Sequence, residues 1–377
     1  MTRMLSLDNI EHLAIGSAFL GTGGGGDPYI GSLLCREAIR EYGPVPLISP
    51  DELKDEDSVF VAAAIGAPTV MIEKLFSVED QHRAVSLLER FMGREATVII
   101  SAEIGGCNSM MPVAYAAMRG LPIVDADGMG RAFPELQMTS MNVNGVKCAP
   151  MTLSDEHGND VLFQTDNGLK AEKMARPITA EMGASACMSC YPMTGAEAKQ
   201  SVVKYTLSAA LSIGAAIAEA NESGDAPVAR LLKALHAHEY YSDAYEIFTG
   251  KISGLERSTE GGWVLGSCTV AALNGRSEAK IAFQNENLTV HVDGVLRAVV
   301  PDLITIIDSE SGHAIPTERL SYGQRVSVIG CSAPPQIKSE KALEIMGPQA
   351  FKLEEQYTPI HSINPPGAVI PKSSKNG

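Results

Sequence analysis

A run of small residues at 21–28 is the first place where residue type and spacing point to chemistry, because it reads Gly-Thr-Gly-Gly-Gly-Gly-Asp-Pro. Four successive glycines cost conformational entropy, and such a run is tolerated where backbone must approach a ligand. We expect the amides of Gly24 and Gly25 to contact substrate, since bare N–H groups can hold an anion. The alternative is a flexible linker between two helices. A dinucleotide site is not favoured because no strand pattern precedes the glycines.

A second stretch, Glu-Ile-Gly-Gly-Cys-Asn-Ser at 103–109, directly follows an apolar segment. Glu103 is a candidate general base, and Cys107 is a candidate metal ligand or nucleophile. The glycine pair offers amide donors for a developing anion, and Asn108 is a candidate substrate contact. Asn and Ser are also ordinary helix caps, so a purely structural role for this end of the stretch stays open.

A third stretch covers 125–135 and begins Asp-Ala-Asp-Gly-Met-Gly. Two carboxylates two residues apart, Asp125 and Asp127, can bind a metal or divide acid and base roles. Asp-Gly is also common in plain turns. Farther along, Gln-Asn-Glu-Asn at 284–287 either turns a hairpin or lends the amides of Asn285 and Asn287 to a substrate.

The cysteines give a weaker indication. Cys187 and Cys190 have the spacing of half a zinc site or of a redox pair, but no second such pair exists, and we favour simple burial. The seven cysteines are an odd number in a chain without a signal-peptide pattern, which argues against a disulfide framework and favours a cytoplasmic protein.

The elements that must position these residues follow from the apolar pattern. Runs at 58–66, 96–102 and 121–124 predict buried strands, and the segments 77–92 and 108–119 predict helices between them. Strand and helix alternating in this way predict a parallel sheet with crossover helices. The second and third stretches then follow neighbouring strands, so we expect them to face one crevice at the carboxyl end of the sheet.

The pattern changes after about residue 170. Thr194 and Glu197 have capping-box spacing and predict one long helix that ends near 223–224, followed by a helix over 227–238. From 244 onward, short alternating segments predict antiparallel strands. The predicted fold class is therefore α/β, with a parallel-sheet N-terminal domain over 1–170. A second, α+β domain, a helix pair with a β-rich part, covers 171–360, and an extended tail begins near Pro359 and covers 361–377.

Composition excludes several classes of protein. The chain has 377 residues and a formal net charge of −15, which repels phosphate backbones and argues against a nucleic-acid partner. No apolar run approaches the roughly 18 residues of a membrane span. We expect no nucleic acid and no membrane among the partners, and a homo-oligomer as the assembled state.

Seven strings occur together in one order, and together they resemble the S-methyl thiohydantoin desulfurase family, once catalogued only as a domain of unknown function. The strings are GTGGGGDP (21–28), GGCNS (105–109), DADGMGRAFPELQM (125–138), YPMTGA (191–196), FQNENL (283–288), PDLI (301–304) and GPQAF (347–351). The resemblance covers nearly the whole chain. It implies two domains and zinc-dependent hydrolysis of a carbon–sulfur bond in a five-membered ring, which releases methanethiol and leaves a hydantoin.

That chemistry suggests roles for the candidate residues. Zinc takes thiolate and carboxylate ligands and keeps one position open for water, so Cys107, Asp125 and Asp127 are the expected ligands. Glu103 is the expected proton shuttle, with Asp127 as a second catalytic carboxylate. Two other functions stay open: a non-catalytic or regulatory subunit of a hydantoinase- or oxoprolinase-type complex, and an amidohydrolase-like enzyme acting on a sulfur-free hydantoin.

Overall fold

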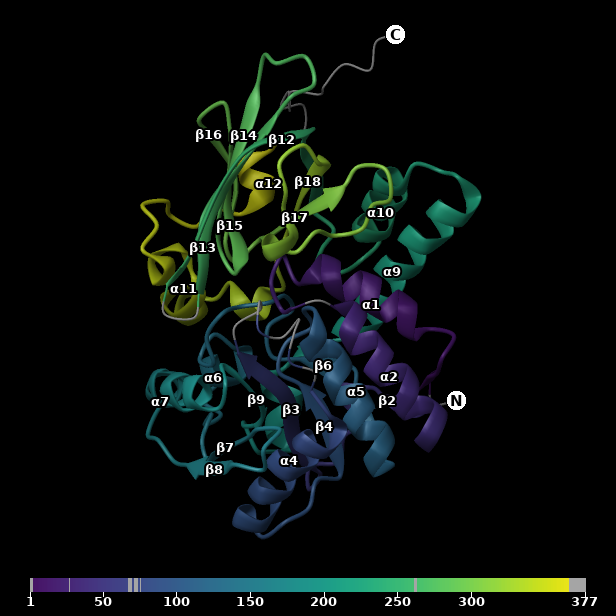
Figure 1. The fold of residues 1–377 in the computed structure, drawn as a ribbon, viewed down its shortest axis with the longest axis vertical. Coiled ribbons are helices and arrows are strands. Elements are labelled where there is room, and N and C mark those ends of the chain that lie inside the picture. Colours follow the sequence, from purple (N-terminus) through teal and green to yellow (C-terminus); the bar gives the residue numbers. More distant parts are fainter. Residues whose placement is uncertain are drawn as a thin grey trace.

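Two sheets, one in each half of the chain, organise the molecule (Figure 1). The structure is a computed structural model and describes residues 3–26, 28–66, 70, 74, 76–260 and 263–365. In Figure 1 the N-terminal α/β part lies below and the β-rich C-terminal part above, with helices α1 and α9 running along one side of their junction. The fold class expected from the sequence is confirmed.

The first sheet has nine strands in the order β1-β2-β5-β4-β3-β9-β7-β8, with β10 paired to β3. Its central strands β2, β5, β4 and β3 are parallel; the apolar runs predicted β3, β4 and β5, and β2 is an addition. Strand β3 (Ser58–Gly66) is buried along almost its whole length because elements cover both faces of the sheet. The other strands are β1 (Arg3–Leu5), β2 (Val45–Ile48), β4 (Val98–Ser101), β5 (Ile123–Val124), β7 (Met151–Ser154), β8 (Asp160–Phe163), β9 (Ser185–Ser189) and β10 (Met193–Thr194).

Helices pack on both faces of this sheet. They are α1 (Ile10–Leu20), α2 (Pro28–Tyr42), α4 (Val78–Met92), α5 (Cys107–Arg119), α6 (Ser140–Val143) and α7 (Gly168–Glu181), with a 3-10 turn η1 (Pro50–Glu52). The glycine run connects α1 to α2, so a helix and not a strand directly precedes the glycines, as the sequence pattern predicted.

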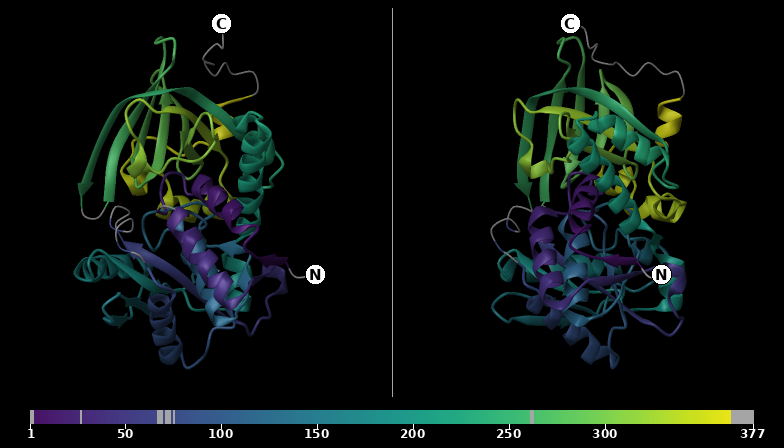
Figure 2. Two further views of the ribbon diagram at one scale, coloured as in Figure 1. Left: turned by 45° about the vertical axis from the view of Figure 1, so that its right-hand side comes forward. Right: turned by 90° about the vertical axis from the view of Figure 1, so that its right-hand side faces the viewer.

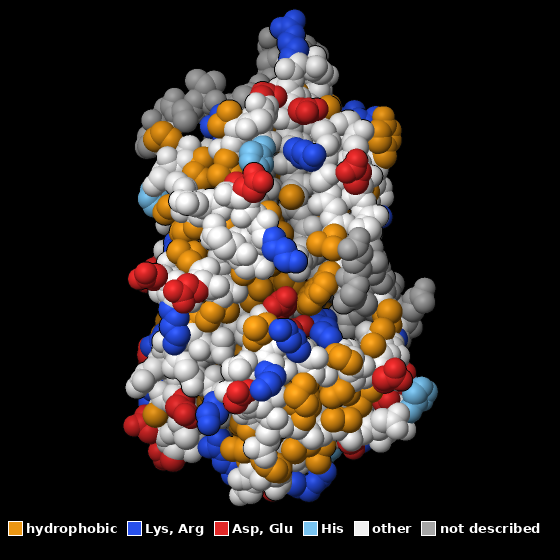
Figure 3. All heavy atoms as spheres, turned by 90° about the vertical axis from the view of Figure 1, so that its left-hand side faces the viewer, with side chains coloured by type: hydrophobic (Ala, Val, Ile, Leu, Met, Phe, Trp, Pro, Cys, Tyr) orange, Lys and Arg blue, Asp and Glu red, His pale blue; other side chains and the backbone are white. Residues whose placement is uncertain are grey.

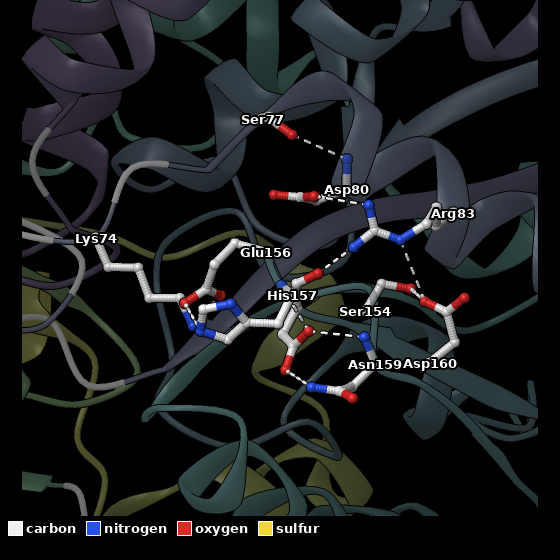
Figure 4. A network of polar contacts seen from close by, with 10 residues as sticks. Lys74, Ser77, Asp80, Arg83, Ser154, Glu156, His157, Asn159 and Asp160 are labelled. Atoms are coloured by element: carbon white, nitrogen blue, oxygen red, sulfur yellow. Dashed lines mark hydrogen bonds and ion pairs between the residues drawn. The ribbon is translucent and has the colours of Figure 1, made fainter.

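A polar network connects α4 to the β7–β8 hairpin (Figure 4). The guanidinium of Arg83 lies 2.9 Å from Asp80 and 3.4 Å from Asp160. Lys74 Nζ lies 2.6 Å from Glu156 and also donates to the carbonyl groups of Met182, at the end of α7, and Ser185, at the start of β9. These contacts hold the antiparallel end of the first sheet in place.

The prediction of one long helix from Thr194 is wrong, because the structure has two helices there. The capping box of Thr194 and Glu197 forms, but helix α8 (Gly195–Ser201) stops after seven residues. The chain then adds strand β11 (Val203–Lys204) to β6 (Ala126–Asp127), and the next helix, α9 (Thr206–Ser223), begins after Tyr205. Tyr205 has φ +62°, a left-handed conformation that breaks the helix, and pairing with β6 supplies the hydrogen bonds that a continuous helix would have made.

The second sheet is antiparallel and curled, with the order β16-β15-β14-β13-β12-β18-β17 (Figure 2). Helix α10 follows α9, and α9 packs directly on α1: a Cβ on Gly16 would lie 1.8 Å from the Ala210 carbonyl oxygen. The remaining elements are α10 (Pro227–His236), β12 (Ala244–Glu260), β13 (Trp263–Ala271), β14 (Glu278–Gln284), β15 (Glu286–Val292), β16 (Val295–Val299), β17 (Leu303–Asp308), η2 (Thr317–Arg319), β18 (Arg325–Cys331), η3 (Pro335–Ile337), α11 (Glu340–Met346), η4 (Pro348–Phe351) and α12 (Ile360–Ile363).

The predicted domain division at residue 170 stays a prediction. Strand β9, which lies beyond it, belongs to the first sheet, while α1 packs on α9.

The prediction of an extended tail from Pro359 is wrong at its start, because buried Ile360 begins the short helix α12. Residues 366–377 of that tail lie outside the described residues. Among the described residues, we find no helix of the length and apolar character that crossing a membrane requires.

Candidate functional site

A cavity of about 80 Å³ lies where the two sheets meet. Its wall comes from the ends of β3, β4 and β9, the glycine run, the 129–139 loop, α7 and the β14–β15 turn. On the face drawn in Figure 3, acidic and basic side chains lie beside hydrophobic ones at the waist of the molecule. The polar side chains of the wall are Glu103, Asn108, Glu135, Thr139, Arg176, Cys190, Tyr191, Asn285 and Glu286.

The glycine run is wedged between both halves and is not a flexible linker. A Cβ on Gly24 would lie 1.9 Å from Glu286 Oε1, and a Cβ on Gly25 would lie 2.6 Å from the carbonyl carbon of Gly105. The Gly25 carbonyl accepts from the Cys107 amide at 2.8 Å. Gly25 lines the cavity, whereas Gly24 packs against the Glu286 carboxyl group. The neighbouring Asp27 lies outside the described residues.

Glu103 is buried and lines the cavity, as the strand-end position predicted. Its Oε1 accepts from Asn108 Nδ2 at 2.7 Å, and its Oε2 has no hydrogen-bond partner in the described part of the chain. Burial, with a smaller contribution from the charge of Asp127, raises the pKa of Glu103 to about 8, although the Asn108 hydrogen bond and the nearby Phe133 amide oppose this shift. A carboxyl group with such a pKa can both accept and return a proton near neutral pH.

Asn108 holds Glu103 in place. Its Oδ1 accepts from the Ala64 amide at 2.8 Å, and its Nδ2 also donates to the Ala64 carbonyl at 3.2 Å. The side chain therefore joins strand β3 to Glu103. The N-cap of α5 is Gly106, so Asn108 is not the cap of this helix. Although Asn108 lines the cavity, its contacts make it a positioning residue for Glu103.

Asp127 is fully buried and is not among the residues that line the cavity. Its Oδ2 accepts from the amides of Ile104 at 2.8 Å, Met129 at 3.0 Å and Gly130 at 2.9 Å. Burial raises its pKa to about 7 despite these hydrogen bonds. The carboxyl group fastens the loop after β4 to the loop after β6, which fixes the backbone that carries Glu103.

Asp125 and Cys107 lie apart from Asp127. Asp125 accepts from the amide of Ser208 at 3.0 Å and from its hydroxyl, and so caps the N-terminus of α9. Burial raises the pKa of Asp125. The Cys107 thiol faces α2, because its Sγ lies 3.3 Å from the place of a Cβ on Gly31. The three predicted zinc ligands therefore contact three different neighbours.

Across the described ranges, no group of three or more His, Cys, Asp or Glu side chains is arranged to hold a metal ion. The donors predicted from the sequence do not fit a zinc ion at this place, because a closed or catalytic zinc site needs at least three converging ligands.

Sequence reasoning missed Glu286, which lies between the two asparagines that it singled out. Glu286 is buried, lines the cavity, and its Oε2 has no partner among the described residues. Burial first, and then the charge of Glu103, raise its pKa, against the opposing charge of Arg131. The signal that could have found it is a lone acidic residue in a turn otherwise made of amides.

The two asparagines mainly shape that turn. Asn285 lies between β14 and β15 with φ +55°, and its Oδ1 accepts from the Val264 amide at 2.9 Å, so the hairpin expectation is confirmed. Asn285 also lines the cavity. Asn287 does not line it. Its amide donates to the Thr22 carbonyl at 2.8 Å and its Nδ2 to the Ile304 carbonyl at 3.0 Å.

Arg131 is a second residue that the sequence did not reveal. Its side chain is fully buried, and the guanidinium donates to the carbonyls of Pro301 at 3.1 Å and Asp302 at 3.0 Å and to Thr22 Oγ1 at 2.9 Å. Burial lowers its pKa only to about 10, with the charges of Glu286 and Asp302 opposing the shift. Arg131 therefore stays a cation at neutral pH and offsets negative charge near the cavity.

The rim of the cavity also joins the two halves. Arg176 on α7 lies over the ring of Trp263 on β13, 4.2 Å from the ring centroid. Its Nη2 donates to the Pro134 carbonyl at 2.6 Å, and Tyr191 Oη donates to the Leu136 carbonyl at 2.7 Å. These two contacts hold the 129–139 loop from both sides.

All seven cysteines are buried and none forms a disulfide. Cys187 packs with Ala84 and Met111, whereas Cys190 lies beside Cys148. The pair at 187 and 190 therefore has two separate environments, and the expectation of simple burial is confirmed.

Comparison with known proteins agrees with this architecture. Residues 8–165 match the model of the S-Me-THD-like N-terminal domain, and residues 165–360 match that of the S-Me-THD-like C-terminal domain. The chain belongs to the S-methyl thiohydantoin desulfurase family. A crystal structure of a protein from Chromobacterium violaceum, 24% identical, has the same fold as this family member, with a TM-score of 0.78 over 95% of this chain and 100% of that one. No curated protein matches the chain.

Proposed function

We propose that the protein is a hydrolase that cleaves the carbon–sulfur bond of an S-methyl thiohydantoin-like ring and leaves a hydantoin and a thiol. Family membership supports the ring class. The observation that carries the proposal is the position of Glu103: a buried carboxyl group with one unpartnered oxygen, in a cavity that both halves of the chain enclose.

The size and lining of the cavity suit such a ring. One water needs about 10–15 Å³ of this kind of volume, so a cavity of about 80 Å³ has room for a small molecule and not for a large one. Ala102, Met129 and Phe133 supply an apolar wall. Gly25 and Gly26 let backbone come close to the ring because they carry no side chain.

The reaction itself adds one water molecule. Glu103 takes a proton from water as the oxygen attacks the ring carbon that carries sulfur, and a tetrahedral intermediate forms. The carbon–sulfur bond then breaks. The water oxygen remains on the carbon as a carbonyl, one of its hydrogens ends on the ring nitrogen, and the other ends on the leaving sulfur. A positioned carboxyl group of near-neutral pKa contributes about 100- to 10,000-fold to such proton transfers.

Thiol release tests the proposal. The purified chain alone is incubated with an S-methyl thiohydantoin, and free thiol and hydantoin are measured together. We expect both products in equal amounts, with a loss of at least about 100-fold in Glu103→Gln. Glu89→Gln is the matched control, because Glu89 is also buried but lies on α4, away from the cavity.

The substrate panel separates the alternatives. A wild-type chain that releases no thiol would contradict the proposal and favour a non-catalytic subunit. Opening of a sulfur-free hydantoin in place of thiol release would favour an amidohydrolase-like enzyme.

A further inference from the structure

We propose that Glu286 is a second catalytic residue of this cavity, and that it gives a proton to the ring while Glu103 takes one from water. The reaction in this inference rests on the proposed function. The pairing of the two carboxyl groups rests on the structure alone.

The two groups reach one cavity from different halves of the chain. Glu103 follows β4 in the first sheet, and Glu286 begins β15 in the second. Both side chains are buried, both line the cavity, and each has one oxygen without a hydrogen-bond partner within the described residues. Buried polar atoms are normally paired, by protein, water or ligand, so two such carboxyl oxygens on residues of one small cavity are the acceptors that a ligand there would meet.

The orientation of each carboxyl group is set by its own neighbour. Asn108 holds Oε1 of Glu103 at 2.7 Å. The Glu286 carboxyl group lies against the backbone of Gly24, so close that a Cβ there would meet both Oε1 and Cδ. Neither group depends on the other for its position, and the second oxygen of each, although closed off from solvent, has no partner within the described residues.

Two carboxylates in so small a volume do not both ionise, because like charges in a low dielectric repel strongly. The charged groups near Glu286 are Glu103, Arg131 and Arg176, and those near Glu103 are Asp127 and Arg131. Glu103 has a pKa of about 8, and the pKa of Glu286 is raised well above its ordinary value, with the charge of Glu103 as the second cause. The Asn108 amide donates to Glu103 and favours its ionised form, so Glu103 is the group that loses its proton and Glu286 the group that keeps one.

This division gives a balanced reaction. Ionised Glu103 takes a proton from water as the oxygen attacks, and protonated Glu286 donates to the ring nitrogen, which yields a neutral tetrahedral intermediate. Glu286 then removes the proton of the new hydroxyl group as the carbonyl forms. The carbon–sulfur bond breaks, and Glu103 gives its proton to the leaving sulfur, which restores both groups to their starting states.

The same arrangement defines the ligand. A protonated carboxyl group donates and accepts at once, so it pairs with a ring edge that also does both, such as an amidine or a cis-amide. We therefore expect the site to bind the ring in its uncharged form.

Infrared difference spectroscopy tests the pairing without any substrate. At about pH 9, above the pKa of about 8 of Glu103, the wild type should show the carbonyl stretch of one protonated carboxylic acid. The band should be absent in Glu286→Gln and unchanged in Glu89→Gln. A band that survives in Glu286→Gln would overturn the pairing.

Kinetics test the role. Glutamine keeps the shape of Glu286 but has no transferable acidic proton, so Glu286→Gln should lower kcat about 100-fold or more with KM changed only a few-fold. A variant that retains more than about a third of wild-type kcat, with thermal melting showing a folded protein, would overturn the catalytic role. If the wild type itself releases no thiol, the proposed function fails, and the infrared band still decides whether the two carboxyl groups share a proton.

Discussion

A single methyl group added at position 24 should greatly reduce the catalytic rate while the protein still folds. In Gly24→Ala the new Cβ would lie 1.9 Å from Glu286 Oε1, whereas real Cβ contacts are not found below 3.0 Å. The carboxyl group must therefore retreat by about 1.1 Å, the difference between these two distances. A displacement of about 1 Å at a reacting group can cost about 100-fold in rate. Overpacking of this kind lowers the free energy of unfolding by about 1–3 kcal/mol.

The assay for Gly24→Ala combines thiol release with urea denaturation. Gly254→Ala is the control, because its new Cβ would make only an ordinary 3.4 Å contact with Thr269. The double variant Gly24→Ala with Glu286→Ala removes the clash, so its stability loss should be smaller than the sum of the single losses while activity stays low. A Gly24→Ala protein with wild-type kcat would refute the reasoning, since it would show that the position of Glu286 does not matter.

Three further predictions concern charge and metal. The folded state keeps the Glu103 proton up to about pH 8, whereas the unfolded chain loses it near 4.5. Stability should therefore fall as pH rises through this window, by at most about 1.4 kcal/mol per unit, and urea titrations of Glu103→Gln should lack this component. Arg131→Met should lower the free energy of unfolding by about 3–5 kcal/mol, because five buried oxygen acceptors lose their donor; a loss below about 1 kcal/mol in urea would contradict that. Elemental analysis of wild type and Cys107→Ala should give the same zinc content. One zinc per chain in the wild type and none in Cys107→Ala would contradict this and support Cys107 as a zinc ligand.

The sequence predicted the parallel half of the fold well because its strands are buried on both faces. The run 58–66 is apolar from Val59 to Ile65, and its short length, with a glycine at its end, favours a strand buried on both faces. The break at Tyr205 was not predictable in this way, since residues on both sides of it are compatible with a helix and only pairing with β6 decides the outcome.

For the site, strand ends predicted Glu103 and its surroundings, and the glycine run predicted Gly25. Glu286 escaped prediction because its importance depends on docking of the second sheet, which brings together residues far apart in the chain. Asp125 was predicted to be a metal ligand because its true partner, the amide of Ser208, could not be foreseen. The sequence placed Ser208 inside a longer helix, whereas α9 begins at Thr206 and leaves that amide free to bond to Asp125.

The fully buried guanidinium of Arg131 has a consequence for how the molecule comes apart. Its partners include carbonyl groups of both the first and the second half of the chain, so water can reach it only if the two halves separate. A partly opened molecule would therefore hold a cation that has lost its acceptors without full hydration. Intermediates of that kind are penalised, and the halves should unfold in one cooperative transition although each contains its own sheet.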